Sequence, residues 1–321
     1  MNPFLNTTYI KTPDKFFGRE REIQEIVKIL KSNVPCSVIG PRRIGKSSLL
    51  YYLKIKDLGL GNYTPVYIDC MDVRKNPKVF LQRICNGLSS ETCPDDLDAL
   101  FDRLDGYLKD KKLLLLLDEI EDIAIKEFGV IFNWLRSKAS SEALNIVTAS
   151  KQEISKVFKV DDDVGSAFYN IFNSITLGVM QEAEVRTMLK TLAAPEFEAK
   201  CGTRIIEEVG THPFLVQQLA ARCYDKWEAN EPFNDDTWVR ILDRPESRIT
   251  ENGRRILEYL SKYGEAKKPR IAVTLRLVAS EMQEAIIKLQ RDSLVELKST
   301  ERDRVSVFGI TEKGRKVAET F

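Results

Sequence analysis

The hydrophobic pattern of the first half of the chain alternates between short apolar runs and longer segments in which apolar residues recur at helical spacing. The short runs predict β-strands over residues 36–39, 65–69, 113–117, 144–150 and 174–178. The longer segments predict helices over residues 48–53, 77–88, 96–108 and 128–137, after a first amphipathic helix that ends near residue 31. Because strands alternate with helices, and one strand is apolar throughout, the pattern predicts an α/β fold with helices on both faces of a parallel sheet.

Beyond residue 178 the apolar spacing is helical, and residues 182–192, 203–209 and 213–227 predict a small all-α domain. The last part of the chain predicts helices over residues 255–262, 273–278 and 281–291, the third of them capped by Ser280. Two strands follow, over residues 294–298 and 305–310, before a closing helix from Thr311. Three helices with a β-hairpin indicate a winged-helix domain. We therefore expect three domains, over residues 1–178, 179–245 and 246–321.

Composition narrows the class of protein. Of the 321 residues, 43% are hydrophobic and 30% charged, which is typical of a soluble globular protein. The net charge of +1 gives no overall field that would favour nucleic acid or an anionic membrane, and a single histidine excludes His-based triads and His-rich metal sites. The longest apolar run, Leu113–Leu117, is too short to span a bilayer. Six dispersed cysteines without a Cys-x-x-Cys pair favour a reducing, cytoplasmic location.

The strongest motif lies between the first strand and the helix that follows it. It reads Gly40, Pro41, Arg42, Arg43, Ile44, Gly45, Lys46, Ser47, the G-x-x-x-x-G-K-[ST] pattern of a phosphate-binding loop (P-loop). Glycine at positions 40 and 45 allows backbone conformations closed to other residues, so that successive N–H groups can surround a phosphate. Lys46 is expected to reach the β- and γ-phosphates, and the Ser47 hydroxyl to ligate Mg²⁺. Ser48 is included among the nucleotide-binding candidates, although packing or capping of the helix is the simpler explanation.

Two carboxylates, Asp118 and Glu119, follow the leucine-rich strand and form a Walker B pattern. The carboxyl end of a parallel strand opens onto the crevice that holds the P-loop. Asp118 is expected to hold Mg²⁺ through a water, and Glu119 to orient or deprotonate the water that attacks the γ-phosphorus. Glu121 and Asp122 are expected to be the solvated start of the next helix. Together the two motifs predict an ATPase of P-loop NTPase fold that binds ATP or ADP with Mg²⁺.

Two further motifs resemble those of AAA+ and STAND ATPases. Phe17, Gly18 and Arg19 belong to a Phe-Gly-Arg-Glu sequence about twenty residues before the P-loop, and His212 and Pro213 lie in a Gly-Thr-His-Pro sequence that is similar to the lid motif of STAND proteins. The order of the four motifs along the chain and the spacing between them resemble those of prokaryotic, largely archaeal-type ATPases at the AAA+/STAND border. The resemblance implies that the first segment borders the adenine and that the proline packs on it from a helical lid.

The same resemblance concerns the end of the fourth strand, where a polar residue senses the γ-phosphate in AAA+ proteins. Thr148 and Ser150 are the candidates for that role. Many STAND proteins have an arginine just after this strand, whereas this sequence has Lys151. Arg136 is the nearest arginine, and none occurs between it and Arg186. The source of an arginine for the γ-phosphate therefore stays open between this chain, a second copy and another protein.

Two function classes remain. The first is an ATP-hydrolysing switch that passes its nucleotide state to a protein partner or to a homo-oligomer, with the winged helix packed on the ATPase. The second is a DNA-binding ATPase similar to archaeal replication initiators or transposition regulators. Residues 248–321 carry about five more basic than acidic residues, which favours duplex DNA. The predicted recognition helix is mixed in charge, and the better phosphate contacts are predicted on the wing. The outward helix residues are Glu281, Gln283, Glu284, Lys288 and Arg291, and the wing residues are Lys298, Arg302 and Arg304.

Overall fold

The computed structural model describes residues 2–5, 8–61, 63–89, 91–158, 168–233, 237–238, 251–291, 294–300 and 306–312, with Arg315 and Ala318. The chain divides into two compact units, residues 1–238 and 239–321, each of which is described by itself. The predicted boundary between residues 245 and 246, and the predicted wing residues Arg302 and Arg304, lie outside the described residues.

The first unit is built on a five-stranded parallel sheet with the strand order β2-β3-β4-β1-β5. Its strands are β1 (Cys36–Ile39), β2 (Tyr63–Asp69), β3 (Lys112–Asp118), β4 (Leu144–Ser150) and β5 (Asn173–Thr176). All five strands were predicted, with bounds that differ by at most two residues. Because β3, β4 and β1 are neighbours, the loops that leave their carboxyl ends meet at one edge of the sheet.

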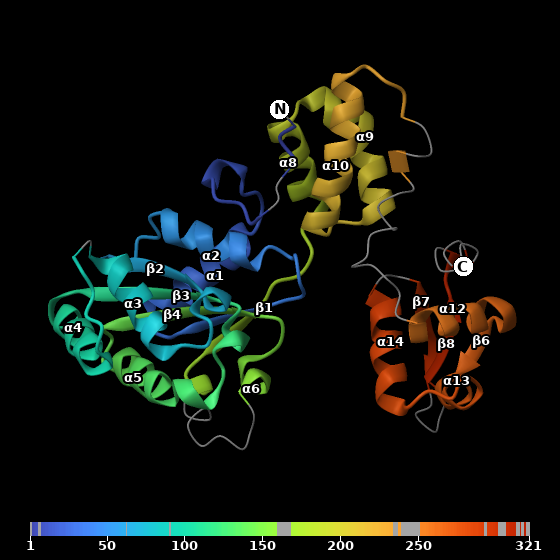
Figure 1. Cartoon of the computed structure of the whole chain (residues 1–321). Coiled ribbons are helices and arrows are strands. Elements are labelled where there is room, and N and C mark those ends of the chain that lie inside the picture. Colours follow the sequence, from blue (N-terminus) through green and yellow to red (C-terminus); the bar gives the residue numbers. More distant parts are fainter. Residues whose placement is uncertain are drawn as a thin grey trace. The chain divides into compact units, whose positions relative to one another are not determined.

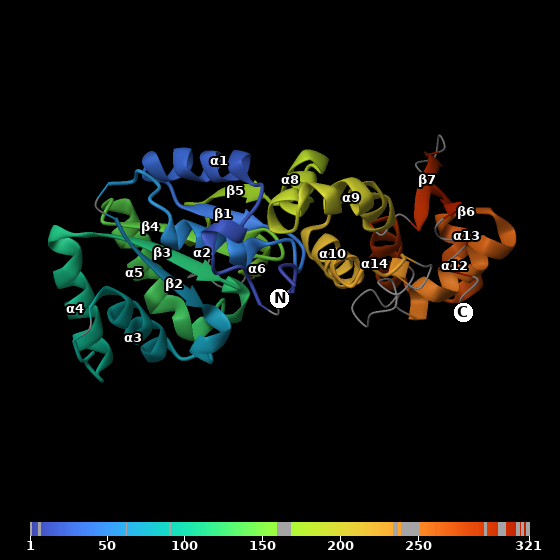
Figure 2. The ribbon, with the colours of Figure 1, turned by 90° about the horizontal axis from the view of Figure 1, so that it is seen from above.

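Helices cover both faces of this sheet (Figure 1, Figure 2). One face carries α1 (Glu20–Lys31) and α2 (Lys46–Ile55), and the other carries α3 (Pro77–Leu88), α4 (Leu97–Asp110) and α5 (Gly129–Ser140). The leucines of β3 alternate between the two hydrophobic clusters, with Leu114 and Leu116 toward α2 and the odd-numbered leucines toward α3–α5. This confirms that β3 is a central strand buried on both faces. The short helix α6 (Ile154–Val157) follows β4.

A bundle of three helices completes the first unit. It consists of α8 (Glu182–Leu192), α9 (Pro195–Val209) and α10 (Pro213–Glu228), which we call the helical bundle. Pro195 and Pro213 stand at the starts of α9 and α10, where a missing N–H costs nothing. The bundle was predicted, but α9 begins eight residues earlier than the sequence pattern indicated.

In its described residues the second unit has three helices with defined bounds and a three-stranded antiparallel sheet in the order β6-β8-β7, and residues 312, 315 and 318 are helical as well. Its elements are α12 (Glu251–Tyr263), β6 (Glu265–Lys267), α13 (Lys268–Leu275), α14 (Ala279–Arg291), β7 (Val295–Thr300) and β8 (Ser306–Ile310). The helices and the hairpin were predicted, but β6 was not. Two details of the prediction differ from the structure: α13 lies about four residues earlier, and α14 begins at Ala279, so that Ser280 lies within the helix and not at the position before it.

All six cysteines are free thiols. Among the residues described here, none of the helices is both long and apolar enough to cross a bilayer.

Candidate functional site

The P-loop joins β1 to α2, and its two glycines are needed for different reasons. Gly45 has a φ of 103°, in the region that favours glycine. Gly40 does not have a positive φ; instead, a Cβ atom there would lie 2.8 Å from the Leu177 carbonyl oxygen. The expectation that both glycines provide unusual backbone angles is therefore correct for Gly45 and wrong for Gly40, where the close approach of the chain after β5 is the constraint.

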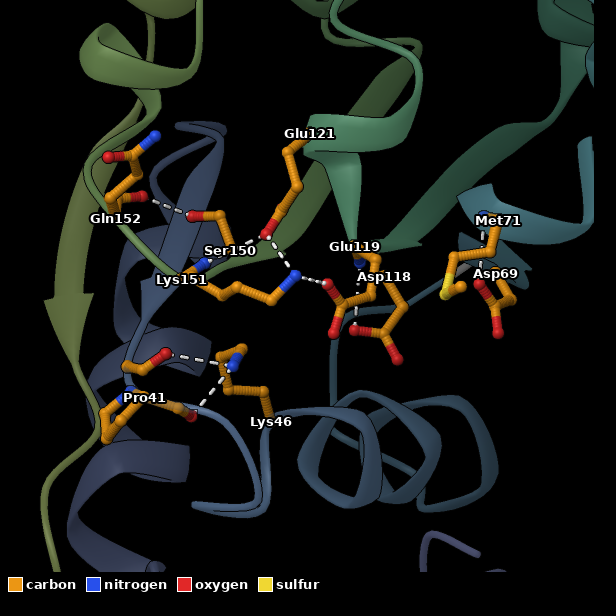
Figure 3. Close-up of polar contacts among 11 residues, drawn as sticks. Pro41, Lys46, Asp69, Met71, Asp118, Glu119, Glu121, Ser150, Lys151 and Gln152 are labelled. Atoms are coloured by element: carbon orange, nitrogen blue, oxygen red, sulfur yellow. Dashed lines mark hydrogen bonds and ion pairs between the residues drawn. The ribbon is translucent and has the colours of Figure 1, made fainter. Parts of the chain in front are cut away.

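Lys46 is the first residue of α2, and its side chain turns back over the loop. Its Nζ donates to the carbonyl oxygens of Gly40 at 2.9 Å and Pro41 at 3.0 Å (Figure 3). The side chain is only 5% exposed. Burial lowers the pKa of Lys46, and the nearby carboxylates of Glu119 and Asp118 partly oppose that shift. The ammonium therefore lies where an anionic ligand would stabilise its charged form.

Asp118 ends β3 and is 2% exposed. Its Oδ2 accepts a hydrogen bond from the Tyr67 hydroxyl at 2.9 Å, and its Oδ1 accepts from the Glu119 N–H at 3.1 Å. Burial raises the pKa of Asp118, and hydrogen bonds from Ser47 and Tyr67 partly offset the rise. The two predicted metal ligands, Ser47 and Asp118, therefore lie close enough for Ser47 to affect the pKa of the carboxyl group.

Lys46 and Asp118 are thus buried groups of opposite charge whose ionised forms are both disfavoured by desolvation. A ligand that brings phosphate oxygens to the lysine and a cation to the carboxylate would relieve both penalties at once. Hydroxyl and carboxylate oxygens are hard ligands that suit Mg²⁺. The residues present therefore fit a nucleotide bound with Mg²⁺.

Glu119 follows β3 in a left-handed conformation with φ 49°, an uncommon backbone state for a residue with a side chain. Its Oε2 lies 2.7 Å from Lys151 Nζ, and the same ammonium is 3.3 Å from Glu121 Oε1. Burial lowers the pKa of Lys151, but hydrogen bonds and the charges of the two glutamates outweigh it, so that the net shift is upward. Figure 3 shows Lys151 between the two glutamates. Glu121 is therefore not simply the solvated start of a helix, as the sequence had suggested.

The two predicted phosphate sensors occupy different places. Thr148 is fully buried and lies on the same face of β4 as Ile146, which packs toward α3–α5. The P-loop helix α2 packs on the opposite face of the sheet. Ser150 ends the strand, where its carbonyl oxygen accepts from the Gly40 N–H at 3.2 Å and its hydroxyl donates to the Gln152 carbonyl at 2.6 Å. The structure therefore brings Ser150 to the P-loop and leaves Thr148 in the sheet interior.

The segment before α1 joins the P-loop to the chain that leads into the helical bundle. Arg19 is only 4% exposed. Its guanidinium donates to the carbonyl oxygens of Ile44 at 3.2 Å and Gly178 at 2.7 Å. Its backbone N–H donates to Glu184 of α8 at 3.2 Å. A Cβ at Gly18 would lie 2.8 Å from the Glu184 carboxyl carbon. The side chain of Arg19 is thus engaged with protein carbonyls, so its contacts support a positioning role and give no support to direct nucleotide binding.

Arg19→Met is expected to destabilise the first unit by about 2–4 kcal/mol, because it leaves buried carbonyl oxygens without their donor. For a unit of this size the melting temperature should fall by roughly 5–15 °C, measurable by circular dichroism. The neighbouring Arg21 is exposed and provides the control, since Arg21→Met should leave the melting temperature almost unchanged. Equal melting temperatures for the two variants would contradict the positioning role.

The helical bundle meets the P-loop at the start of α10. His212 is the residue before the helix and Pro213 its first residue. The next residue, Phe214, lies under the guanidinium of Arg43, with 4.1 Å between the Arg43 Cζ and the ring centroid. Ser48, by contrast, accepts a hydrogen bond from the Ile10 N–H at 3.0 Å. Its contact therefore ties the N-terminal segment to α2, which fits the packing interpretation.

The other P-loop and adenine-side candidates are placed as follows. Arg42 is exposed, Pro41 and Phe17 are half-buried, and Ile44 is buried in the cluster between the sheet and α1–α2.

Comparison with known proteins decides the family. Residues 5–308 match the family described as Novel STAND NTPase 1. The chain belongs to this family. A search of curated proteins gave no match.

Solved structures share the fold of this STAND NTPase. The Walker-type ATPase of Pyrococcus abyssi has a TM-score of 0.63 at 13% identity, with 99% of this chain and 100% of that chain covered. The ORC2 protein of Aeropyrum pernix, solved as ADPNP and ADP complexes, has a TM-score of 0.61 at 14% identity, covering 99% and 96%. The ORC1 protein of Aeropyrum pernix, solved in complex with DNA, has a TM-score of 0.50 at 14% identity, covering 98% and 94%. At these identities the likeness concerns the fold alone.

Two participants of the site in this STAND NTPase were missed by sequence reasoning, Tyr67 and Phe214, and a third, Glu121, was expected only as the solvated start of a helix. Tyr67 lies opposite Leu116 in the register of β2 and β3, and therefore on the same face as Asp118. Strand alternation could have indicated that position, but not its hydrogen bond. Phe214 directly follows a recognised motif, and its pairing with Arg43 depends on how the bundle packs.

Proposed function

We propose that this STAND NTPase is an ATP-hydrolysing molecular switch of the cytoplasm that passes its nucleotide state to a protein partner or to a homo-oligomer. The family match and the fold it shares with nucleotide-bound ATPases support nucleotide binding. The buried pair of Lys46 and Asp118 at the carboxyl edge of β1 and β3 carries the proposal, because burial disfavours the charged form of each group and a bound ion of opposite sign would relieve that penalty.

In this proposal each polar group at the sheet edge has one task. The N–H groups of the P-loop and Lys46 bind the phosphates, and Ser47 and Asp118 hold Mg²⁺. The metal would neutralise charge on the phosphate oxygens. Glu119 accepts the proton of the attacking water, once its carboxylate exchanges the Lys151 ammonium for that water. Ser150, held against Gly40, is the polar group that reports the γ-phosphate.

The helical bundle acts in this proposal as the lid. Phe17 and Gly18 border the adenine from the core, and His212 and Pro213 from the bundle. Support comes from two contacts that join core and bundle, the stacking of Arg43 on Phe214 and the hydrogen bond from the Arg19 N–H to Glu184. A lid fixed at both points would respond to any movement of the P-loop.

Lys46→Ala is expected to weaken ATP binding by at least about 10- to 100-fold, since a hydrogen bond to a charged group contributes about 1.5–3 kcal/mol. Fluorescence titration with a labelled ATP analogue measures this affinity. Lys54→Ala, on the same helix, is the matched control and should bind as the parent does. If Lys46→Ala and Lys54→Ala have the same affinity, the assignment of the phosphate site is wrong.

A second candidate is a DNA-binding ATPase that uses the C-terminal unit on duplex DNA. The observation in its favour is the combination of three helices, a β-hairpin and an excess of basic residues, which is of the winged-helix type. Two observations favour a protein partner instead. Lys298 is paired with Glu296 at 2.6 Å, and several large apolar side chains of this unit are exposed. These exposed side chains are Tyr263, Val273, Val278, Ile287 and Leu297.

Binding of a labelled duplex at increasing salt distinguishes the two candidates. A DNA-binding protein loses affinity steeply as salt rises, because bound counterions are released. We expect no measurable specific binding, together with a nucleotide-dependent change in oligomeric state in size-exclusion chromatography with light scattering. Tight, salt-dependent binding to duplex DNA would support the second candidate.

A further inference from the structure

The described residues near the start of the chain, 2–5 and 8–10, which we call the strap, are anchored at one end in the helical bundle. The Asn2 side chain donates to the Ala221 carbonyl at 2.7 Å and to Asp225 Oδ1 at 2.8 Å, both on α10. Phe4 is fully buried, and its ring stacks on Phe197 of α9 with 5.6 Å between centroids. A phenylalanine from outside the bundle thus completes the hydrophobic core of the bundle.

The other end of the strap is anchored on the nucleotide core, next to the P-loop helix. The Ile10 N–H donates to the hydroxyl of Ser48, two residues after the P-loop lysine. The Tyr9 ring lies 5.3 Å from Tyr51 of α2 and 5.8 Å from Tyr67 of β2, centroid to centroid. The strap therefore contacts α2 and β2, two elements that lie next to the carboxylate of Asp118.

Tyr67 connects this second anchor to the proposed metal ligand. Its hydroxyl donates to Asp118 Oδ2 at 2.9 Å. The ring of Tyr9 packs against the ring of Tyr67, with 5.8 Å between their centroids. Contacts thus run from Asp118 through Tyr67 to Tyr9, and the covalent chain joins Tyr9 to Phe4 in the bundle.

Chain length makes this connection restrictive. Five residue steps separate Phe4 from Tyr9, and an extended chain covers at most about 3.6 Å per residue, or roughly 18 Å in total. While both anchors hold, the bundle cannot move further than this from the tyrosine cluster. Wider opening of the bundle requires that one anchor be released.

We propose that Tyr67 is a positioning residue for Asp118, and that the strap transmits the state of this carboxylate to the helical bundle. This inference rests on the proposed function. A cation at Asp118 changes the charge of the group to which Tyr67 donates, and so changes how firmly Tyr67 and Tyr9 hold the strap. Because coupling between two sites is reciprocal, loosening the strap must change the affinity for the metal by the same factor.

Hydrogen–deuterium exchange of the full-length protein tests the proposal, with the peptide that covers residues 2–10 followed in ADP alone and in ADP with Mg²⁺. We expect the exchange of this peptide to depend on Mg²⁺. Tyr67→Phe should abolish that dependence and weaken Mg²⁺ binding to the ADP complex by roughly 10- to 100-fold, the usual effect of one lost hydrogen bond to a charged group. Affinity for ADP without Mg²⁺ should stay the same, which a merely structural role of Tyr67 does not predict.

Two variants make the test specific. Tyr107→Phe is the matched control, since it also removes a buried tyrosine hydroxyl, one that donates to Thr64 at 2.7 Å on the same strand as Tyr67. It should alter neither readout. Phe4→Ala should raise exchange over residues 2–10 and, by reciprocity, change Mg²⁺ affinity.

The outcomes separate this inference from the function on which it rests. If ADP and Mg²⁺ bind while Tyr67→Phe behaves as Tyr107→Phe does, the inference is wrong and the proposed function stands. If calorimetry detects no nucleotide binding by the parent protein, both are wrong. Should Phe4→Ala fail to fold, the comparison of the two tyrosine variants decides alone.

Discussion

Replacing Glu119 by glutamine is expected to lower the turnover number for ATP by about 10²- to 10⁴-fold, the usual contribution of a general base. The amide has nearly the same shape but cannot accept the proton of the attacking water. Lys46, Ser47 and Asp118 are unchanged, so ATP and Mg²⁺ should still bind. Phosphate release at saturating ATP measures the first effect, and equilibrium binding of ATP measures the second.

Glu121→Gln is the matched control for this prediction, because Glu121 contacts the same ammonium of Lys151 at 3.3 Å. Loss of one partly exposed ion pair costs at most about 1 kcal/mol, which limits the change in turnover to roughly fivefold. If Glu119→Gln hydrolyses ATP at the parent rate, the proton acceptor lies elsewhere.

The second large effect concerns the isolated chain, which is expected to hydrolyse ATP slowly and to be stimulated by assembly or by a partner. An arginine supplied to the γ-phosphate raises the rate by about 10³- to 10⁵-fold. In this chain Lys151 stands where an arginine would be expected, and its ammonium is held by Glu119 and Glu121. Arg186 is paired with Glu198 at 2.6 Å within the helical bundle.

Turnover per active site, measured over a wide range of protein concentration with and without duplex DNA, tests this expectation. A rise with concentration indicates that a second copy supplies the missing group, and a rise with DNA supports the second candidate function. Fast turnover by a demonstrated monomer, independent of both variables, would show that the site is complete in one chain.

The fold of the first unit could be predicted because its local and global signals agree. The bounds of α3 match the prediction, since Asn76 caps the helix and Pro77 starts it. The second unit was predicted less well. Strand β6 has three residues, Glu265–Lys267, of which one is buried, and it exists only through its pairing with β8. An apolar pattern that short carries no periodicity.

The candidate site shows the same division between local and long-range information. Lys46, Ser47 and Asp118 could be placed because a loop motif and a strand edge determine where they lie. The role of Arg19 could not, because apart from its i,i+3 ion pair with Glu22 it donates to carbonyl oxygens such as that of Gly178, which carry no sequence signal. Any residue provides a backbone carbonyl, so such contacts appear only when the chain is folded.

Calorimetric titration of the full-length protein with ATP, in the presence and absence of Mg²⁺, tests the central claim most directly. The account predicts one ATP per chain, with an affinity that rises when Mg²⁺ is present because Asp118 and Ser47 then take part in binding. An absence of saturable ATP binding would contradict the account. So would a parent protein whose ATP affinity is as insensitive to Mg²⁺ as that of Asp118→Asn.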